Sequence, residues 1–126
     1  MITYKRGQAI GMDATLAFDG DKEVGFCRYE EKDPQSVRIA LVEIVNEKYD
    51  RRGIGTALLR QACEGYKHVT MSVLSQASFG MCCKALGKPT DVLGKIENLP
   101  FTWNGSGRIN NPSCELYFNL GALDNP

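Results

Sequence analysis

The 126-residue sequence has neither a net charge nor a long apolar run. Fifteen basic residues balance 15 acidic ones, so the broad positive field that favours nonspecific nucleic-acid binding is absent. No apolar stretch approaches the ~18 residues of a membrane span, and the N-terminus lacks the apolar segment of a secretory signal. We therefore expect a cytoplasmic protein without nucleic-acid or membrane partners.

Metal-ligand patterns are also missing. The sequence has five cysteines and one histidine but no CxxC pair, and Cys82 and Cys83 are adjacent. This spacing suits neither a zinc site nor an ordinary disulfide framework. His68 has no partner arrangement typical of nucleophilic catalysis, and we expect reduced, mostly buried thiols and no metal.

Alternating apolar residues predict five strands, over residues 14–18, 23–29, 36–46, 69–74 and 114–120. Asp19-Gly20-Asp21 is typical of a hairpin turn between the first two, and Asp33-Pro34 ends the second. Helical spacing predicts helices over 55–66 and 77–86, with Gly87 as the C-cap of the later helix. Residues 88–112 are rich in Gly, Asn and Pro and are expected to be mostly irregular.

These elements predict a single domain over residues 1–126 of the α/β (α+β) class. The step from Asn46 to Leu74 reads as a right-handed crossover between parallel strands. We expect a mixed, twisted central sheet of about six strands with helices on both faces.

The segment after the long central strand carries the clearest chemical signal. Gly53 and Gly55 tighten a turn at which a helix begins, and the unpaired amides of such a turn favour a phosphate. A Walker A motif would need Lys after Gly55, where Thr56 stands. A dinucleotide fingerprint would need Gly or Ala at Leu58. Both nucleotide readings therefore fail.

The segment from Val45 to Leu59 resembles motif A of the GNAT acyltransferases, Gln/Arg-x-x-Gly-x-Gly/Ala after the fourth strand. The looser resemblance extends from Ala14 to Gly87. Asp50 stands where the family has Gln or Arg, so the loop amides and nearby arginines would hold the phosphates. The resemblance implies that the pyrophosphate of acetyl-CoA binds to Arg51, Arg52, Gly53, Ile54, Gly55 and Thr56.

The same resemblance implies further site residues. Ile44, Val45 and Asn46 would pair with pantetheine, and the Val45 amide would polarise the thioester carbonyl. A later family pattern places Gln76 at a cofactor-binding Asn and Cys83 at a Tyr that protonates the departing thiolate. The alternative is that Cys83 is a small buried hydrophobe, and that the thiolate leaves unaided or takes a proton from water.

Glu43 is the candidate general base. Strand alternation puts it on one face with Val37, Ile39, Leu41 and Val45, and a carboxylate on an apolar face is desolvated unless it has a role. Desolvation raises the pKa of a carboxyl group, which suits a base. Half of a buried ion pair is the alternative.

The function implied by the resemblance is N-acetyl transfer from acetyl-CoA to a primary amine of a small molecule or protein, by direct attack in a ternary complex. Only about a dozen residues precede the strand at Ala14, where relatives have two helices. This shortening predicts an open acceptor site, or one closed by a homodimer partner. The alternative is a degenerate CoA-binding or protein-interaction module without turnover.

Overall fold

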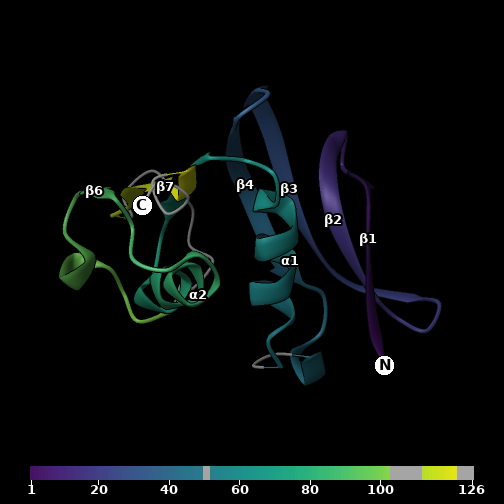
Figure 1. Ribbon diagram of the computed structural model, residues 1–126. Coiled ribbons are helices and arrows are strands. Elements are labelled where there is room, and N and C mark those ends of the chain that lie inside the picture. Colours follow the sequence, from purple (N-terminus) through teal and green to yellow (C-terminus); the bar gives the residue numbers. More distant parts are fainter. Residues whose placement is uncertain (50–51, 103–111, 122–126) are drawn as a thin grey trace.

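One seven-stranded sheet, in the order β1-β2-β3-β4-β5-β7-β6, runs through the computed structural model, which describes residues 1–49, 52–102 and 112–121 (Figure 1). Strands β4 and β5 pair in parallel and all other neighbours are antiparallel. The strands are β1 (Ile2–Ala9), β2 (Met12–Asp19), β3 (Lys22–Asp33), β4 (Ser36–Ile44), β5 (His68–Val73), β6 (Asp91–Leu93) and β7 (Cys114–Asn119). The helices are α1 (Ile54–Cys63) and α2 (Gln76–Leu86), with short 3-10 turns η1 (Glu47–Tyr49) and η2 (Ile96–Asn98).

The predicted strands and helices all occur, with ends shifted by a few residues. The β2–β3 hairpin turns at Gly20, which has φ +62°, and α2 ends at Gly87, as expected. Two further strands were missed. One is β1, which joins β2 through Ile10 and Gly11, both with positive φ. The other is the three-residue β6 within the stretch expected to be irregular.

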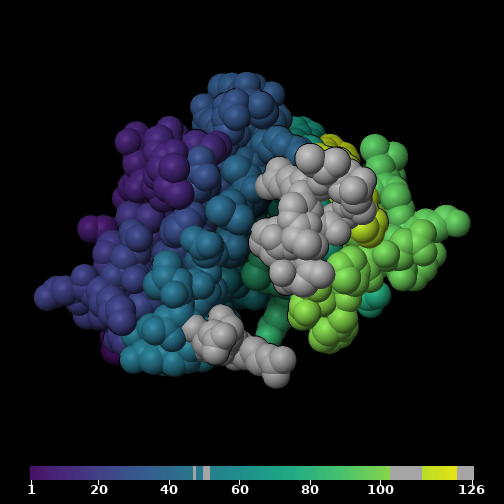
Figure 2. All heavy atoms as spheres, turned by 180° about the vertical axis from the view of Figure 1, so that it is seen from behind, coloured from purple at the N-terminus to yellow at the C-terminus, as the bar shows by residue number. Residues whose placement is uncertain are grey.

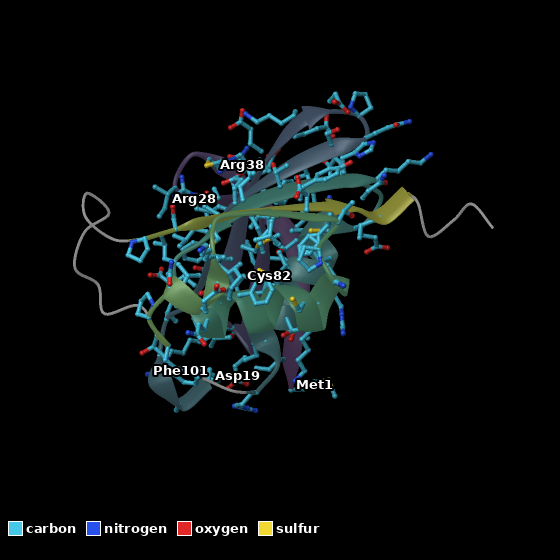
Figure 3. The ribbon with its side chains drawn as sticks, turned by 90° about the vertical axis from the view of Figure 1, so that its left-hand side faces the viewer. Met1, Asp19, Arg28, Arg38, Cys82 and Phe101 are labelled. Atoms are coloured by element: carbon cyan, nitrogen blue, oxygen red, sulfur yellow. The ribbon has the colours of Figure 1, made fainter. Side chains whose placement is uncertain are left out.

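Both α-helices cover the same face of the sheet. Helix α1 packs over β2, β3 and β4, α2 packs over β5, and the two helices contact each other. Figure 3 shows both helices on one side of the sheet. Within the described residues, the expectation of helices on both faces is therefore wrong. We call the face away from α1 and α2 the outer face.

A β-bulge interrupts the central strand β4. Arg28 pairs with Leu41 and the next residue, Tyr29, pairs with Ile39, so Ala40 is an extra residue on β4. One extra residue reverses the faces to which the following side chains point.

This reversal splits the face on which Glu43 was predicted to lie. Ile39 is buried under the helices before the bulge, and Val42 and Ile44 pack there after it. Leu41 and Glu43 consequently point to the outer face, and both are exposed. The prediction of a continuous apolar face carrying a desolvated Glu43 is wrong.

The main core lies between the sheet and the helices, where Leu58 of α1 and Leu116 of β7 are fully buried. A buried hydroxyl also joins the layers, since Thr15 Oγ1 donates to the Leu58 carbonyl over 2.9 Å. A smaller cluster of Ala14, Leu16 and Phe26 lies apart from this core. Across the parts of the chain that the structure describes, no helix is long and apolar enough to cross a membrane.

Candidate functional site

A cleft opens where β4 and β5 part. Their pairing begins at Ser36 and His68 and ends at Ile39 and Met71, although both strands continue. The cleft beyond this point encloses about 580 Å³. It is lined by Ile39, Ala40, Leu41, Val42, Glu43, Ile44, Met71, Ser72, Val73, Leu74, Ser78, Met81 and Cys82. In the space-filling view, the N-terminal strands (purple to blue) and residues 80–100 (green) form two sides of the molecule (Figure 2).

The glycine turn at the start of α1 has the geometry expected of a phosphate site. Gly53 is the N-cap, with φ +79°, and no side chain caps the helix. Ala57 donates to the Gly53 carbonyl over 3.0 Å. The amides of Ile54, Gly55 and Thr56 precede this first helical bond and have no acceptor within the helix. The helix dipole adds partial positive charge at the same end.

Gly55 connects this turn to the cleft. A Cβ at Gly55 would lie 2.9 Å from Met81 Sδ and 3.7 Å from Val42 Cγ1. Both neighbours line the cleft. The missing side chain therefore keeps open the space between β4 and α2, a requirement that the sequence motif alone does not reveal.

Two of the three residues predicted to pair with pantetheine, Val45 and Asn46, lie beyond the cleft. The Val45 amide donates to the Val24 carbonyl of β3 over 3.0 Å, so it points away from β5. The Asn46 carbonyl accepts from the Tyr49 amide, and its side chain accepts from the Lys48 amide. Neither Val45 nor Asn46 lines the cleft, and the prediction that the Val45 amide polarises a carbonyl there is wrong.

Because successive backbone N–H groups of a strand point in opposite directions, amides of β4 can take the role predicted for the Val45 amide. Because the Val45 amide faces β3, the amides of Ile44 and Val42 face the β5 side, where β4 no longer has a neighbour to pair with. Of the three predicted residues, Ile44 alone lines the cleft.

Glu43 also lines the cleft, at its outer-face side, opposite Phe26 of β3. Its carboxylate is in no hydrogen bond or ion pair with another described residue, and the residue is exposed. The alternative of a buried ion pair is therefore also wrong among the described residues. Its role as a base stays a prediction.

Helix α2 presents Cys82, and not Cys83, to the cleft. Ser75 caps the helix by accepting from the Ser78 amide, and this start places Ser78, Met81 and Cys82 along one side. Cys82 is 2% exposed and donates to Met71 Sδ, and burial raises the pKa of its thiol to about 12. Cys83 is absent from the cleft lining, so the structure does not bring it to the site as predicted.

Gln76 is the first residue of α2, and both its side-chain and its backbone amide donate to carbonyls outside the cleft. Its side-chain amide donates to the Leu99 carbonyl over 3.0 Å, and its backbone amide donates to the Pro100 carbonyl. These bonds hold the segment after η2 against the start of α2. Gln76 does not line the cleft, and its cofactor role stays a prediction.

The structure describes one of the two arginines of the motif, Arg52. Arg51 lies outside the described residues, as does Asp50. The Arg52 guanidinium lies 5.5 Å from the ring centre of Tyr49. Tyr49 is 2% exposed, and its hydroxyl donates to Asp19 Oδ2 over 2.8 Å, a hydrogen bond that lowers the pKa of Asp19. No periodicity in the sequence indicates that Tyr49 is buried, bonded to Asp19 and in contact with Arg52.

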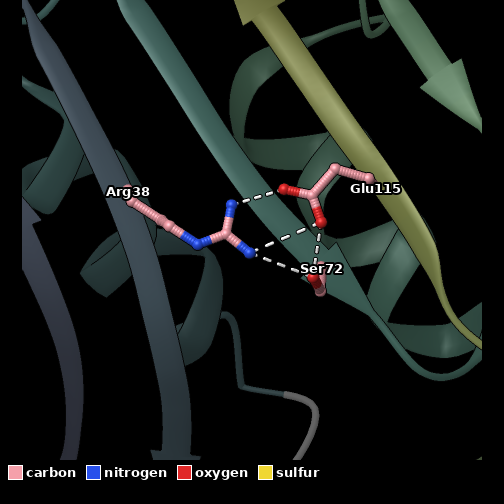
Figure 4. Close-up of polar contacts among 3 residues, drawn as sticks. All are labelled: Arg38, Ser72 and Glu115. Atoms are coloured by element: carbon pink, nitrogen blue, oxygen red, sulfur yellow. Dashed lines mark hydrogen bonds and ion pairs between the residues drawn. The ribbon is translucent and has the colours of Figure 1, made fainter.

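A polar cluster on the outer face spans the strands at the point where they part (Figure 4). Arg38 of β4 reaches across β5 and makes an ion pair with Glu115 of β7. Ser72 of β5 accepts from Arg38 Nη2 over 3.1 Å and donates to Glu115 Oε2. The Arg38 bond lowers the pKa of Glu115, and the same bond raises that of Arg38. Sequence reasoning missed this cluster because its residues lie on three strands.

Solved structures identify the fold. A GNAT family acetyltransferase from Elizabethkingia anophelis with acetyl-CoA bound superposes with a TM-score of 0.66 at 18% identity, covering 94% of this chain and 98% of that one. A Bacillus subtilis acetyltransferase in complex with CoA gives 0.68 at 15% identity, with 95% and 99% covered. An IAA acetyltransferase from Bacillus cereus gives 0.69 at 16% identity, with 95% and 100% covered.

These likenesses show that the chain has the fold of the GNAT acetyltransferases, which confirms the fold that the sequence resemblance predicted. No protein-family model matches the sequence, and a comparison with curated proteins finds no match.

Proposed function

We propose that the protein binds acetyl-CoA in the cleft between β4 and β5 and transfers the acetyl group to a primary amine. The observation that carries this proposal is the parting of the two strands beside the uncapped start of α1. One cavity is thus adjacent both to unpaired strand backbone and to the positive end of a helix. Solved structures of this fold hold acetyl-CoA or CoA, which supports the same ligand here.

The described residues fit acetyl-CoA. The amides of Ile54, Gly55 and Thr56 would bind the pyrophosphate, because they lack helical acceptors and lie at the positive end of the dipole. The amides and carbonyls of β4 that face β5, at Val42 and Ile44, would pair with the amides of pantetheine. The absent side chain of Gly55 leaves space for this linkage.

Acetyl-CoA supplies an activated thioester; in the transfer the amine nitrogen bonds to the acetyl carbon and the carbon–sulfur bond breaks. A β4 amide facing the cleft, from Val42 or Ile44, would donate to the carbonyl oxygen as negative charge develops on it. Glu43 would accept the proton of the ammonium group, directly or through a water, from the outer-face side of the cleft.

The departing thiolate has no evident acid among the described residues of the cleft. Cys82 is the thiol nearest to this chemistry, but its pKa of about 12 makes it a weaker acid than an ordinary thiol of about 8.5. Proton transfer from Cys82 to the thiolate would run uphill. We therefore assign this proton to water, in place of the predicted Cys83.

Binding is tested by thermal unfolding with CoA, acetyl-CoA, ATP and NAD. A ligand at 100 times its Kd stabilises the folded state by about 2.7 kcal/mol, so CoA and acetyl-CoA should raise Tm clearly and the other nucleotides should not. Turnover is tested by release of free CoA thiol with a panel of amines, peptides and proteins. Absence of a shift with millimolar CoA contradicts the proposal.

The second candidate is a CoA-binding module without turnover. It is favoured by the absence of a suitable acid from the described cleft residues. The two candidates differ in one result: a module would show the CoA-dependent rise in Tm, but no thiol release with any acceptor.

A further inference from the structure

A second cavity lies on the outer face, directly against the cleft. It encloses about 420 Å³ and is lined by Arg28, Arg38, Ile39, Ala40, Leu41, Ser72, Leu74 and Ser113. Five of these residues also line the cleft: Ile39, Ala40, Leu41, Ser72 and Leu74. The two cavities therefore meet in the gap between β4 and β5. An acceptor that reaches a thioester in this gap from the outer face must occupy the second cavity, which we call the outer pocket.

Two arginines give the outer pocket its charge, and they differ in their partners. Figure 3 shows Arg28 and Arg38 on the side of the sheet away from the helices. Arg38 is neutralised by Glu115 and held by Ser72. Arg28 makes one hydrogen bond, from Nη2 to the Ile10 carbonyl over 3.3 Å. In the described parts of the chain no carboxylate pairs with it.

The Arg28 guanidinium also has an unsatisfied buried donor. Its Nε–H is buried and has no hydrogen-bond partner among the described residues. A buried donor without an acceptor is costly, and a guanidinium presents its donors in a fork that matches a carboxylate. An acceptor bringing only an ammonium group would be repelled by the guanidinium charge, whereas a carboxylate in the outer pocket would be attracted to it and could accept from the Nη groups, which make a single hydrogen bond.

Glu43 completes the arrangement. Arg28 pairs with Leu41 on β4, and Glu43 is two residues further along the same outer face, a separation of about 7 Å along a strand. A negative side chain at the mouth of the cleft suits the ammonium, and the positive one beside it suits an anion.

We propose that the acetyl acceptor is an amino acid, with its amine directed to the cleft and its carboxylate bound by Arg28. This inference rests on the proposed acetyl transfer and names its substrate class. Arg28 thereby determines specificity, while Glu43 and the β4 amides serve every amine.

The test compares matched acceptors with and without a carboxylate: L-lysine against cadaverine, and L-phenylalanine against phenethylamine. The kcat/KM of each is measured from release of CoA thiol. We expect each amino acid to exceed its decarboxylated partner by about 10- to 100-fold, the range of a charge-assisted hydrogen bond. Arg28→Gln should reduce this ratio to near one, by slowing the amino acids and by relieving the repulsion of the simple amines.

Arg60→Gln is the matched control. Arg60 of α1 is an exposed arginine that also donates to backbone carbonyls, those of Lys84 and Ala85, but it lies on the helix side of the sheet. The control removes the same charge and should leave the ratio unchanged.

A second variant protects the test against misfolding of Arg28→Gln. Leu41→Glu introduces a carboxylate directly across from Arg28 at a position that is 38% exposed. It should occupy the guanidinium and lower the ratio between each amino acid and its decarboxylated partner, the same readout as for Arg28→Gln.

The outcomes separate this inference from the proposed function. Amines acetylated as well as amino acids, or a ratio unaffected by either variant, would overturn the role of Arg28 while acetyl transfer stands. Absence of thiol release with all four acceptors, but release with another amine, peptide or protein, would overturn the amino-acid class alone; absence with every acceptor would contradict both.

Discussion

Gly55→Ala tests whether the gap between α1, β4 and α2 holds the ligand. The added Cβ would lie 2.9 Å from Met81 Sδ, roughly 1 Å closer than the optimum for nonbonded heavy atoms. The Met81 side chain is flexible and partly buried, so it can move, but Val42 limits the space on the other side. We expect Met81 to shift into the cleft that it lines.

Opposing terms make the effect on stability small. Overpacking a well-packed site costs about 1–3 kcal/mol, and replacing a helical Gly by Ala returns about 0.5–1 kcal/mol. Gly55→Ala should therefore lower the free energy of unfolding by about 0–2.5 kcal/mol. A Met81 displacement that excludes one or two methylene contacts of the ligand, each worth about 0.8 kcal/mol, should raise the Kd for CoA by about 4- to 15-fold.

The assay is calorimetric titration with CoA on four proteins: the wild type, Gly55→Ala, Met81→Ala and the double variant. If the Met81 side chain causes the loss, removing it in the Gly55→Ala background should restore the wild-type Kd. The coupling between the two substitutions should then be about 1 kcal/mol.

Gly53→Ala is the matched control. Gly53 has φ +79° and no atom within 4 Å of an added Cβ, so Ala there costs about 1–2 kcal/mol of backbone strain without a clash. Any loss of CoA affinity in Gly53→Ala should therefore persist when Met81→Ala is added. An unchanged Kd in Gly55→Ala would refute the assignment of the gap to the ligand. A loss that Met81→Ala fails to restore would mean that the turn amides, and not the cleft width, carry the effect.

Three other substitutions test single interactions. Thr15→Val removes the buried hydrogen bond to Leu58 and should lower the free energy of unfolding by about 1 kcal/mol in urea titrations; no change would mean that the bond contributes nothing net. Glu115→Gln breaks the partly exposed pair with Arg38 and should cost less than about 1 kcal/mol at pH 7. Because the pKa of Glu115 is lowered on folding, this stabilisation is present above the unfolded value near 4.5 and is lost as pH falls through the folded value. A deficit that stays constant as pH falls far below this unfolded value would therefore contradict the ion pair as its cause. Glu43→Gln should lower kcat by about 10²–10⁴-fold with unchanged Tm, since the side chain is exposed; near-normal turnover across pH would remove Glu43 as the base.

The sequence predicts those elements whose signal is local. Apolar residues at helical spacing and the Gly87 stop locate both helices, and Asp19-Gly20-Asp21 locates the β2–β3 turn. Strand β1 escapes because its turn uses Ile10, a β-branched residue at φ +50°, in place of the usual Asn-Gly. The three-residue β6 is stabilised by pairing with β7, an interaction that no short sequence window contains.

The candidate site is less predictable because it depends on pairing between strands. Glycine spacing is enough to locate the start of α1, which needs a left-handed residue at Gly53. It does not reveal that the Val45 amide is already bound to Val24. The adjacent thiols Cys82 and Cys83 are likewise indistinguishable until the rotation of α2 is known, and only the first reaches the cleft.

The bulge at Ala40 links the cleft to the chemistry proposed for it. A regular β4 would keep Leu41 and Glu43 on the helix side, where a carboxylate would be buried against the core. The extra residue instead turns Glu43 to the outer face and directs Val42 and Ile44 towards the helices. It lies next to Ile39, the last residue of β4 that pairs with β5, and a bulge bends its strand and increases the local twist. The irregularity that defeats the alternation rule is therefore also a physical cause for the parting of β4 from β5.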